Sequence, residues 1–184
     1  MNKNIIAILA VMLIIVLVGF SSYNRLVAID ENVNGKWSQV ENQLQRRADL
    51  IPNLVETVKG FAAHEEQVLS EVSAARAKLA GAQTVPEAAA ADAELTSALS
   101  RLLVVVENYP TLKADANFRQ LQDELAGTEN RIATSRMDYN TAVEHYNSTI
   151  RRFPDMIWAR MLGFDSREYF KADEGAHDVP EVKF

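Results

Sequence analysis

The side chains that most often carry metal-dependent and acid–base chemistry are scarce in this sequence. Its histidines are His64, His145 and His177. A zinc site of the HExxH type needs a second histidine four residues after the first, whereas the segment from His64 reads HEEQV. A di-iron bundle needs a Glu-x-x-His motif on each of two helices, and only Glu174 and His177 have this spacing. We therefore predict no metal site and interpret His64 as a helix-cap or surface residue.

Several other classes of chemistry lack the residues that they require. The chain has no cysteine, which excludes disulfides, thiolate metal ligands and cysteine nucleophiles. It has neither a glycine-rich phosphate loop nor a serine in a nucleophile-elbow context. The formal net charge of −6 leaves no basic surplus to neutralise nucleic-acid phosphates. We expect no enzymatic activity, no cofactor and no nucleic-acid partner.

Charged and polar residues that flank predicted apolar stripes are the remaining candidates for a site. Glu129, Arg136 and Asn140 are spaced by seven and four residues, so they lie on roughly one face of the last predicted helix. Arg47 flanks the stripe of the first helix in the same way. If these helices pack together, Arg47 or Arg136 meets Glu129 or Asp49 across the interface. Such a network fixes helix register more than it adds stability. The alternative is a set of solvated charges on helix edges.

A proline interrupts the first of these helices within the string RRADLIPNLVETVKG. Proline inside a helix removes one backbone hydrogen bond and costs about 3 kcal/mol or more. Here Pro52 cannot donate to the carbonyl of Ala48, so we expect the helix to bend at this point. Asp49 is suited to cap the segment that resumes after it, and Arg46 and Arg47 are suited to reach free carbonyls. We predict one kinked, internally capped helix rather than two separate helices.

The amino-terminal stretch IIAILAVMLIIVLVGF, residues 5–20, is entirely apolar, and no charge lies between Asn4 and Asn24. A helix over this charge-free segment spans about 31 Å, close to the thickness of the hydrocarbon core of a bilayer. We expect residues 5–24 to form an uncleaved anchor that makes the chain a single-pass protein of the cell (inner) membrane. Apolar side chains along this anchor include Ile5, Leu13 and Phe20. The alternative is a cleaved signal peptide, since Lys3 suits an n-region, although no A-x-A pattern follows.

The side of the membrane on which the body of the protein lies stays open at this point. Lys3 and the α-amino group precede the apolar stretch, and Arg25 and Lys36 follow it within the window of the positive-inside rule. The short segment before the stretch resembles that of a signal anchor with its amino end in the cytoplasm. This favours an extracytoplasmic body.

Apolar residues recur at steps of three and four along most of the remaining chain, which indicates amphipathic helices. A first helix over residues 23–60 carries such a stripe, and whether it continues past Gly60 is left open. Thr84 and Glu87 form a capping-box pattern with a proline in the first turn, and they predict the start of the next helix. Pro110 is expected to stop that helix.

The last long helix has the most regular stripe. Its positions are Phe118, Leu121, Leu125, Thr128, Ile132, Ser135, Tyr139, Val143, Tyr146, Ile150 and Phe153. A stripe this long needs several helical partners, and an antiparallel up-and-down four-helix bundle supplies them. We therefore predict an all-α fold in which a transmembrane helix precedes such a bundle. The apolar repeat near 3.5 residues is also typical of coiled coils.

The segment DMIWARMLGF follows Pro154 and is expected to form a short helical piece. Its apolar side chains are Met156, Trp158, Met161 and Phe164, which either cap the bundle or touch the membrane interface. The acidic tail beyond it has few apolar residues and is expected to be disordered. The predicted organisation is a short tail at 1–4, the anchor at 5–24, the bundle at 25–170 and the disordered tail at 171–184.

Two blocks of the sequence resemble the LemA family. The first contains RRADLIPNLV and VKGFAAHE, and the second contains YPTLKADANFRQL and ENRIATSRMDYN. The resemblance covers about residues 22–170 and implies a transmembrane helix followed by an antiparallel four-helix bundle. It implies no established molecular function. Family members are often encoded near membrane-associated TPM-domain proteins, which implies a partner of that kind. Short amino termini in the family imply an amino end outside the cell, opposite to the residue-based preference above.

Three functions follow as hypotheses. The first is a membrane-anchored scaffold or interaction protein that self-associates as a homo-oligomer through the bundle or the anchor. The second is an enzyme or metal-binding bundle that uses Glu129, Arg136, His64 or His145 at the helix interfaces. The third is a cleaved and secreted soluble bundle. Uninterrupted apolar stripes, together with the missing catalytic constellation, favour the first.

Overall fold

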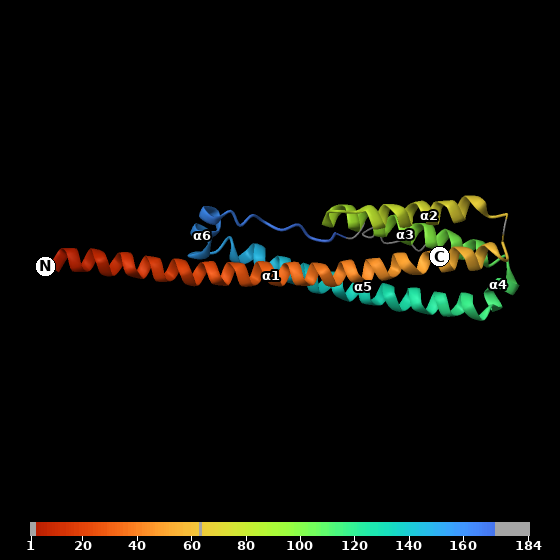
Figure 1. Ribbon diagram of the computed structural model, residues 1–184, viewed down its shortest axis with the longest axis horizontal. Coiled ribbons are helices and arrows are strands. Elements are labelled where there is room, and N and C mark those ends of the chain that lie inside the picture. The colour runs from red at the N-terminus through yellow and green to blue at the C-terminus, as the bar shows by residue number, and fades with distance from the viewer. Residues whose placement is uncertain (1–2, 63, 172–184) are drawn as a thin grey trace, which may run out of the picture. The chain divides into compact units, whose positions relative to one another are not determined.

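The computed structural model describes residues 3–62 and 64–171, and every regular element in these ranges is helical (Figure 1). The helices are α1 (Lys3–Lys59), α2 (Glu66–Gly81), α3 (Val85–Val106), α4 (Pro110–Ala114), α5 (Ala116–Thr149) and α6 (Asp155–Leu162). The predicted all-α fold is confirmed. Glu174 and His177, and the tail predicted to be disordered from residue 172 onward, lie outside the described residues.

The chain forms two compact units, and α1 and α5 each contribute to both. We call the first the anchor unit; it combines the residues up to Trp37 with Asp138–Glu168. The second, which we call the bundle unit, combines Ser38–Met137 with the described residues 169–171. The sequence predicted one bundle over 25–170 and gave no sign of this division.

The bundle unit is built from the carboxyl-terminal part of α1, from α2 and α3, and from the first part of α5. Its core consists of apolar side chains spaced along one face of each helix. Among them are Val40, Leu44, Ile51, Leu54, Val58, Leu69, Val72, Leu79, Leu95, Leu99, Leu102, Phe118 and Ile132. Because steps of three and four keep these residues on one face of each helix, each stripe is covered by neighbouring helices.

α1 runs unbroken from the apolar amino-terminal stretch into the bundle. No interruption separates an anchor helix from a helix beginning at residue 23, so its 57 residues extend over about 85 Å. The helix ends at Lys59, which settles the question raised by Gly60. The amides of Phe61 and Ala62 both donate to the carbonyl of Val58, at 3.0 and 2.8 Å, and this tight turn closes the helix.

The predicted start of α3 is confirmed in atomic detail. The amide of Glu87 donates to Oγ1 of Thr84 at 3.3 Å, and the amide of Thr84 donates back to Oε2 of Glu87 at 3.2 Å. The amide of Gln83 also donates to Oε2 of Glu87, at 2.9 Å. These amide donors of Gln83 and Thr84 hold the pKa of Glu87 below its usual value, because they favour the charged carboxylate. α3 ends at Val106, and Pro110 opens α4.

In the anchor unit the second part of α5 packs on α1. Leu26 and Val33 of α1 and Val143, Tyr146 and Ile150 of α5 are buried. The rings of Trp37 and Tyr139 pack with their centroids 5.3 Å apart. One stripe position was predicted wrongly, since Phe153 is 78% exposed. α5 ends at Thr149, so the helical phase no longer applies at that residue.

An extended segment over residues 164–168, which we call the strap, is held on α5 by side chains. Tyr139 Oη donates to the carbonyl of Glu168 at 2.8 Å, and Tyr146 Oη donates to that of Asp165 at 3.0 Å. The side chain of Asn147 donates to the carbonyl of Arg167 and accepts from its amide, both at 2.9 Å. Each tyrosine therefore fills the core with its ring while its hydroxyl satisfies strap backbone. Burial raises the pKa of both phenols.

Candidate functional site

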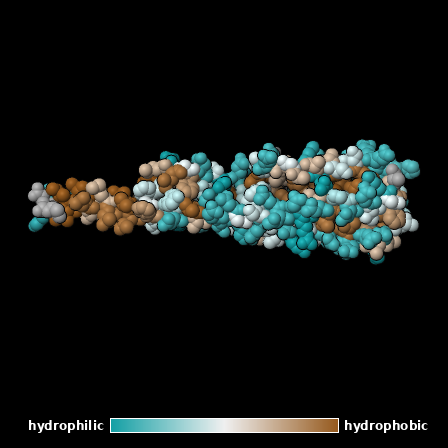
Figure 2. All heavy atoms as spheres, viewed as in Figure 1, coloured by the Kyte–Doolittle hydropathy of each residue, from teal (hydrophilic) through white to brown (hydrophobic). Residues whose placement is uncertain are grey.

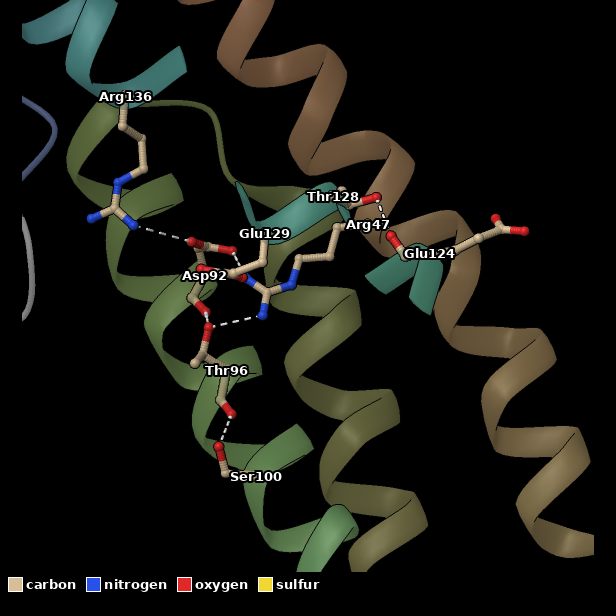
Figure 3. Close-up of polar contacts among 8 residues, drawn as sticks. All are labelled: Arg47, Asp92, Thr96, Ser100, Glu124, Thr128, Glu129 and Arg136. Carbon is tan, nitrogen blue, oxygen red and sulfur yellow. Dashed lines mark hydrogen bonds and ion pairs between the residues drawn. The ribbon is translucent and has the colours of Figure 1, made fainter. Parts of the chain in front are cut away.

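A cluster of charged side chains lies inside the bundle unit, centred on Arg47 of α1 (Figure 3). Its Nη1 lies 2.6 Å from Oδ1 of Asp92 on α3 and 2.8 Å from Oε2 of Glu129 on α5. Its Nη2 donates to Oγ1 of Thr96 at 3.0 Å. Arg136, also on α5, places its Nη1 3.7 Å from the other carboxylate oxygen of Asp92. We call these four charged residues the buried charge cluster, and they tie together three helices.

The members of the buried charge cluster differ in their contact with solvent. The side chains of Arg47 and Asp92 are only 5% and 3% exposed, whereas that of Glu129 is 44% exposed. Two guanidinium groups face two carboxylates, so the cluster carries no net charge. Removing two charges from water costs several kcal/mol per ion, which their attraction and hydrogen bonds offset only when both partners are present. Removal of either Arg47 or Asp92 would therefore leave the other charge buried without its partner.

The structure brings together most of the residues predicted for an interhelical network. Arg47, Glu129 and Arg136 all join the buried charge cluster. Asp49 does not, because it is exposed and accepts a hydrogen bond from Gln45 Nε2 at 2.8 Å on its own helix. Asn140 is half-buried and belongs to the anchor unit.

Asp92 is the member that the sequence prediction missed. It lies among alanines of α3, in a stretch for which the sequence analysis named no candidate residue. A signal was nevertheless present, since Asp92 is four residues after Ala88 and three before Leu95, both buried on α3. A carboxylate at a position on the apolar stripe of a helix needs a buried cation as its partner.

The groups that surround Pro52 do not take the roles predicted for them. α1 continues as one helix through Pro52, so Asp49 lies inside it and starts no second segment. The carbonyl of Ala48, which Pro52 leaves without its helical donor, accepts a hydrogen bond from Nε of Arg76 on α2 at 2.8 Å. Arg46 is exposed and Arg47 turns into the buried charge cluster, so neither takes the role predicted for it. The bend at Pro52 stays a prediction.

A groove of about 480 Å³ borders the buried charge cluster. Its lining includes the apolar side chains of Leu54, Leu99, Leu103 and Leu125, with Arg47, Thr96 and Glu129 as polar members. Of the charged groups in this lining, Arg47 and Glu129 are engaged with each other, and Asp123 also lines the groove. Within residues 3–62 and 64–171, no group of three or more His, Asp or Glu side chains is placed to hold a metal ion, and His64 and His145 lie exposed.

The residues predicted for the membrane anchor lie on one helix, and their role in a membrane stays a prediction. Ile5, Leu13 and Phe20 are all exposed on the amino-terminal part of α1. Figure 2 shows hydrophobic residues covering this part of the helix, in contrast to the largely hydrophilic face of the bundle unit. In the described part of the chain, α1 is the one helix long and apolar enough to cross a membrane.

Comparison with known proteins gives consistent matches. The model of the LemA family matches residues 36–184, which leaves the apolar stretch outside the match. Magnetosome protein MamQ 2 of Paramagnetospirillum magneticum is 31% identical, covering 87% of this chain and 68% of that protein. MamQ of Magnetospirillum gryphiswaldense is 30% identical with the same coverage. Protein LemA of Metamycoplasma hominis is 24% identical over 82% of this chain and 69% of its own length.

Proposed function

Since the chain belongs to the LemA family, we propose that it is a membrane-anchored helical-bundle scaffold that self-associates. The observation that carries this proposal is the construction of α1. The same helix exposes an apolar stretch long enough to span a bilayer and supplies core residues to the bundle unit.

The polar interior of the bundle unit supports a structural role. Arg47, Asp92, Glu129 and Arg136 neutralise one another, so the cluster offers no unpaired charge to stabilise a transition state. Its placement across three helices is suited to fixing their register. None of the relatives described above is named as an enzyme, and the MamQ proteins are named for the magnetosome. We infer that this chain organises a membrane-associated structure.

Anchoring also supports self-association. Chains confined to one membrane meet at a much higher effective concentration than free chains do, so weak contacts between bundles suffice. Leu103 and Val104 of α3 are exposed apolar residues on the bundle unit, and Val104 is 71% exposed. Burial against a second copy would remove this apolar surface from water, worth about 25 cal/mol per Å².

The test uses the full chain extracted from native membranes in a mild detergent. We expect its mass, measured by light scattering and by native mass spectrometry after crosslinking, to correspond to more than one copy. A strict monomer without a copurifying protein contradicts the proposal. The same preparation would reveal a membrane-associated TPM-domain partner, which the family resemblance implies.

The side of the membrane is tested on the same protein. The chain has no cysteine, so Ala77→Cys on α2 introduces one exposed thiol on the bundle unit, away from the apolar surface of Leu103 and Val104. We expect an impermeant maleimide to label this thiol in intact cells, as an extracytoplasmic body requires. Labelling only after lysis would place the bundle in the cytoplasm.

A further inference from the structure

α6 packs against the carboxyl end of the apolar stretch of α1, within the anchor unit (Figure 1). The ring of Trp158 closes on Gly19 so tightly that a Cβ at this position would lie 2.8 Å from the ring atom Cη2. Any larger residue would push the indole away. A pocket of about 480 Å³ remains between the two helices, lined by Val16, Gly19, Phe20, Tyr23, Trp158 and Leu162. α6 therefore lies beside the last turns of the anchor.

The orientation of α6 about its own axis is fixed by contacts on one face. The buried carboxylate of Asp155 forms an ion pair with Arg25 of α1, with Nη1 and Oδ2 3.2 Å apart. Ala159, one turn later, is also buried. Beyond the helix, the rings of Phe164 and Tyr23 meet edge to face, with centroids 6.4 Å apart. The opposite face of α6 is consequently held outward.

That outward face is apolar. Ile157 and Met161 are exposed on α6, and Met161 is 70% exposed; Phe153 is exposed just before the helix. Capping, one of the two sequence-based alternatives, does not account for apolar side chains that stay exposed on α6. Val16 and Phe20 of α1 are exposed beside the same helix, so the apolar surface of α6 continues that of the anchor.

Basic side chains border this apolar surface. Arg151 and Arg152 are exposed in the turn before α6, and Arg160 is exposed on the helix itself. None of the three takes part in an ion pair recorded among residues 3–62 and 64–171. The local positive charge is notable in a chain whose formal net charge is −6. Arginine binds phosphate oxygens through its fork of N–H donors, and basic residues beside a membrane attract anionic headgroups.

We propose that residues 151–162 form an interfacial segment that lies on a bilayer containing anionic lipids. Phe153, Ile157 and Met161 insert among the acyl chains near the headgroups, while Arg151, Arg152 and Arg160 bind lipid phosphates. This inference rests on the proposed anchor, because the bilayer that covers residues 5–20 meets α6 at the height of Gly19. The consequence is a second attachment that sets the tilt of the anchor unit on the membrane.

Spin labels on single cysteines test the insertion in the full chain, reconstituted in nanodiscs that contain phosphatidylcholine and phosphatidylglycerol. The variants are Met161→Cys on α6, Ala77→Cys on α2 as a water-exposed control and Leu13→Cys in the anchor. Relaxation by oxygen, relative to relaxation by an aqueous nickel complex, reports immersion in lipid. We expect this ratio to be several-fold higher at positions 161 and 13 than at position 77.

The outcomes separate this inference from the proposed function. A lipid-like ratio at position 13 with a water-like ratio at position 161 would overturn the interfacial segment and leave the anchor intact. A water-like ratio at position 13 would overturn the anchor, and this inference with it.

A second measurement tests the role of charge. Liposome binding of α6 cannot be separated from the anchor, so the readout is the immersion depth at position 161 with and without phosphatidylglycerol. We expect the anionic lipid to deepen the label, and each arginine to contribute roughly fivefold to the preference for the inserted state. Replacement of Arg151, Arg152 and Arg160 by Gln should abolish the deepening. The matched control replaces Arg46, Arg119 and Arg131, which are exposed on the bundle unit. Binding of anionic headgroups is contradicted if both triple variants change the immersion depth equally. It is also contradicted if phosphatidylglycerol does not change the immersion depth of the wild-type arginine background.

Discussion

Two isosteric substitutions, Asp92→Asn and Glu129→Gln, test how burial governs the charge cluster of the bundle. Each removes one negative charge from the same partner, Arg47, and each leaves the net charge of the chain equally changed. They differ in environment, since the Asp92 side chain is 3% exposed and that of Glu129 is 44% exposed. Any difference between the two variants in the free energy of unfolding therefore measures how solvent exposure weakens the interaction of each carboxylate with Arg47.

The magnitudes follow from the geometry. At about 4 Å between charge centres and an effective dielectric constant of about 20, a pair attracts by about 4 kcal/mol. Asp92→Asn leaves the buried guanidinium of Arg47 with a single, partly solvated counter-charge, so we expect a loss of about 3 to 5 kcal/mol. In Glu129→Gln the Arg47–Asp92 contact at 2.6 Å persists. The oxygen of Glu129 that meets Arg47 is buried, but its side chain as a whole is 44% exposed, so we expect a smaller loss of about 1 kcal/mol.

The assay is urea unfolding of the full chain in mild detergent, followed by helical circular dichroism near pH 7. The free energy of unfolding is compared among the wild type, both single variants and the double variant. The single effects should not add, because the two carboxylates share Nη1 of Arg47. If Glu129→Gln destabilised the protein as much as Asp92→Asn, burial would not be the deciding quantity and the reasoning would be refuted.

Two further predictions concern helix termini and breaks. Arg76→Met should destabilise the bundle by about 1 kcal/mol, because it removes the donor to the carbonyl of Ala48, which Pro52 leaves without a helical donor. The loss of stability should be smaller in a Pro52→Ala background, where the helix supplies its own donor. An equal loss in both backgrounds of this double-mutant cycle contradicts the prediction. The pKa of Glu87 is lowered by the amides of Gln83 and Thr84, so its contribution to stability is present above the unfolded pKa of about 4.3 and is lost as pH falls through the folded value. The stability difference between the wild type and Glu87→Gln should therefore narrow on acidification, whereas a difference independent of pH contradicts the capping role.

Local rules predicted the elements well because their causes are local. The apolar stretch, the stripes and the Thr84 capping box each depend on residues within a few turns of one another. The division into two units and the unbroken course of α1 depend on how distant segments pack, which spacing does not encode. Phe153 shows the same limit at a helix end. It lies beyond the end of α5 at Thr149, so the helical spacing no longer places it on the buried face.

The candidate site was predictable where charges flank a stripe and was missed where a charge replaces part of one. Arg47, Glu129 and Arg136 were found because they adjoin apolar positions at helical spacing. Asp92 was overlooked because alanines surround it, and a small-residue stretch gives a weak stripe. Arg76 was overlooked for a different reason, since its partner is a backbone carbonyl whose lack of a donor arises from Pro52 on another helix.

The two blocks that mark the LemA resemblance meet in space at the buried charge cluster. RRADLIPNLV supplies Arg47, ENRIATSRMDYN supplies Glu129 and Arg136, and the segment between them supplies Asp92. Apolar stripes with nearly uniform spacing allow helices to slide by a turn at modest cost, because one buried leucine can replace another. A buried arginine that slides loses its carboxylate and is left uncompensated, which costs several kcal/mol. We infer that the charged residues of these strings select one register among otherwise similar packings of the same helices.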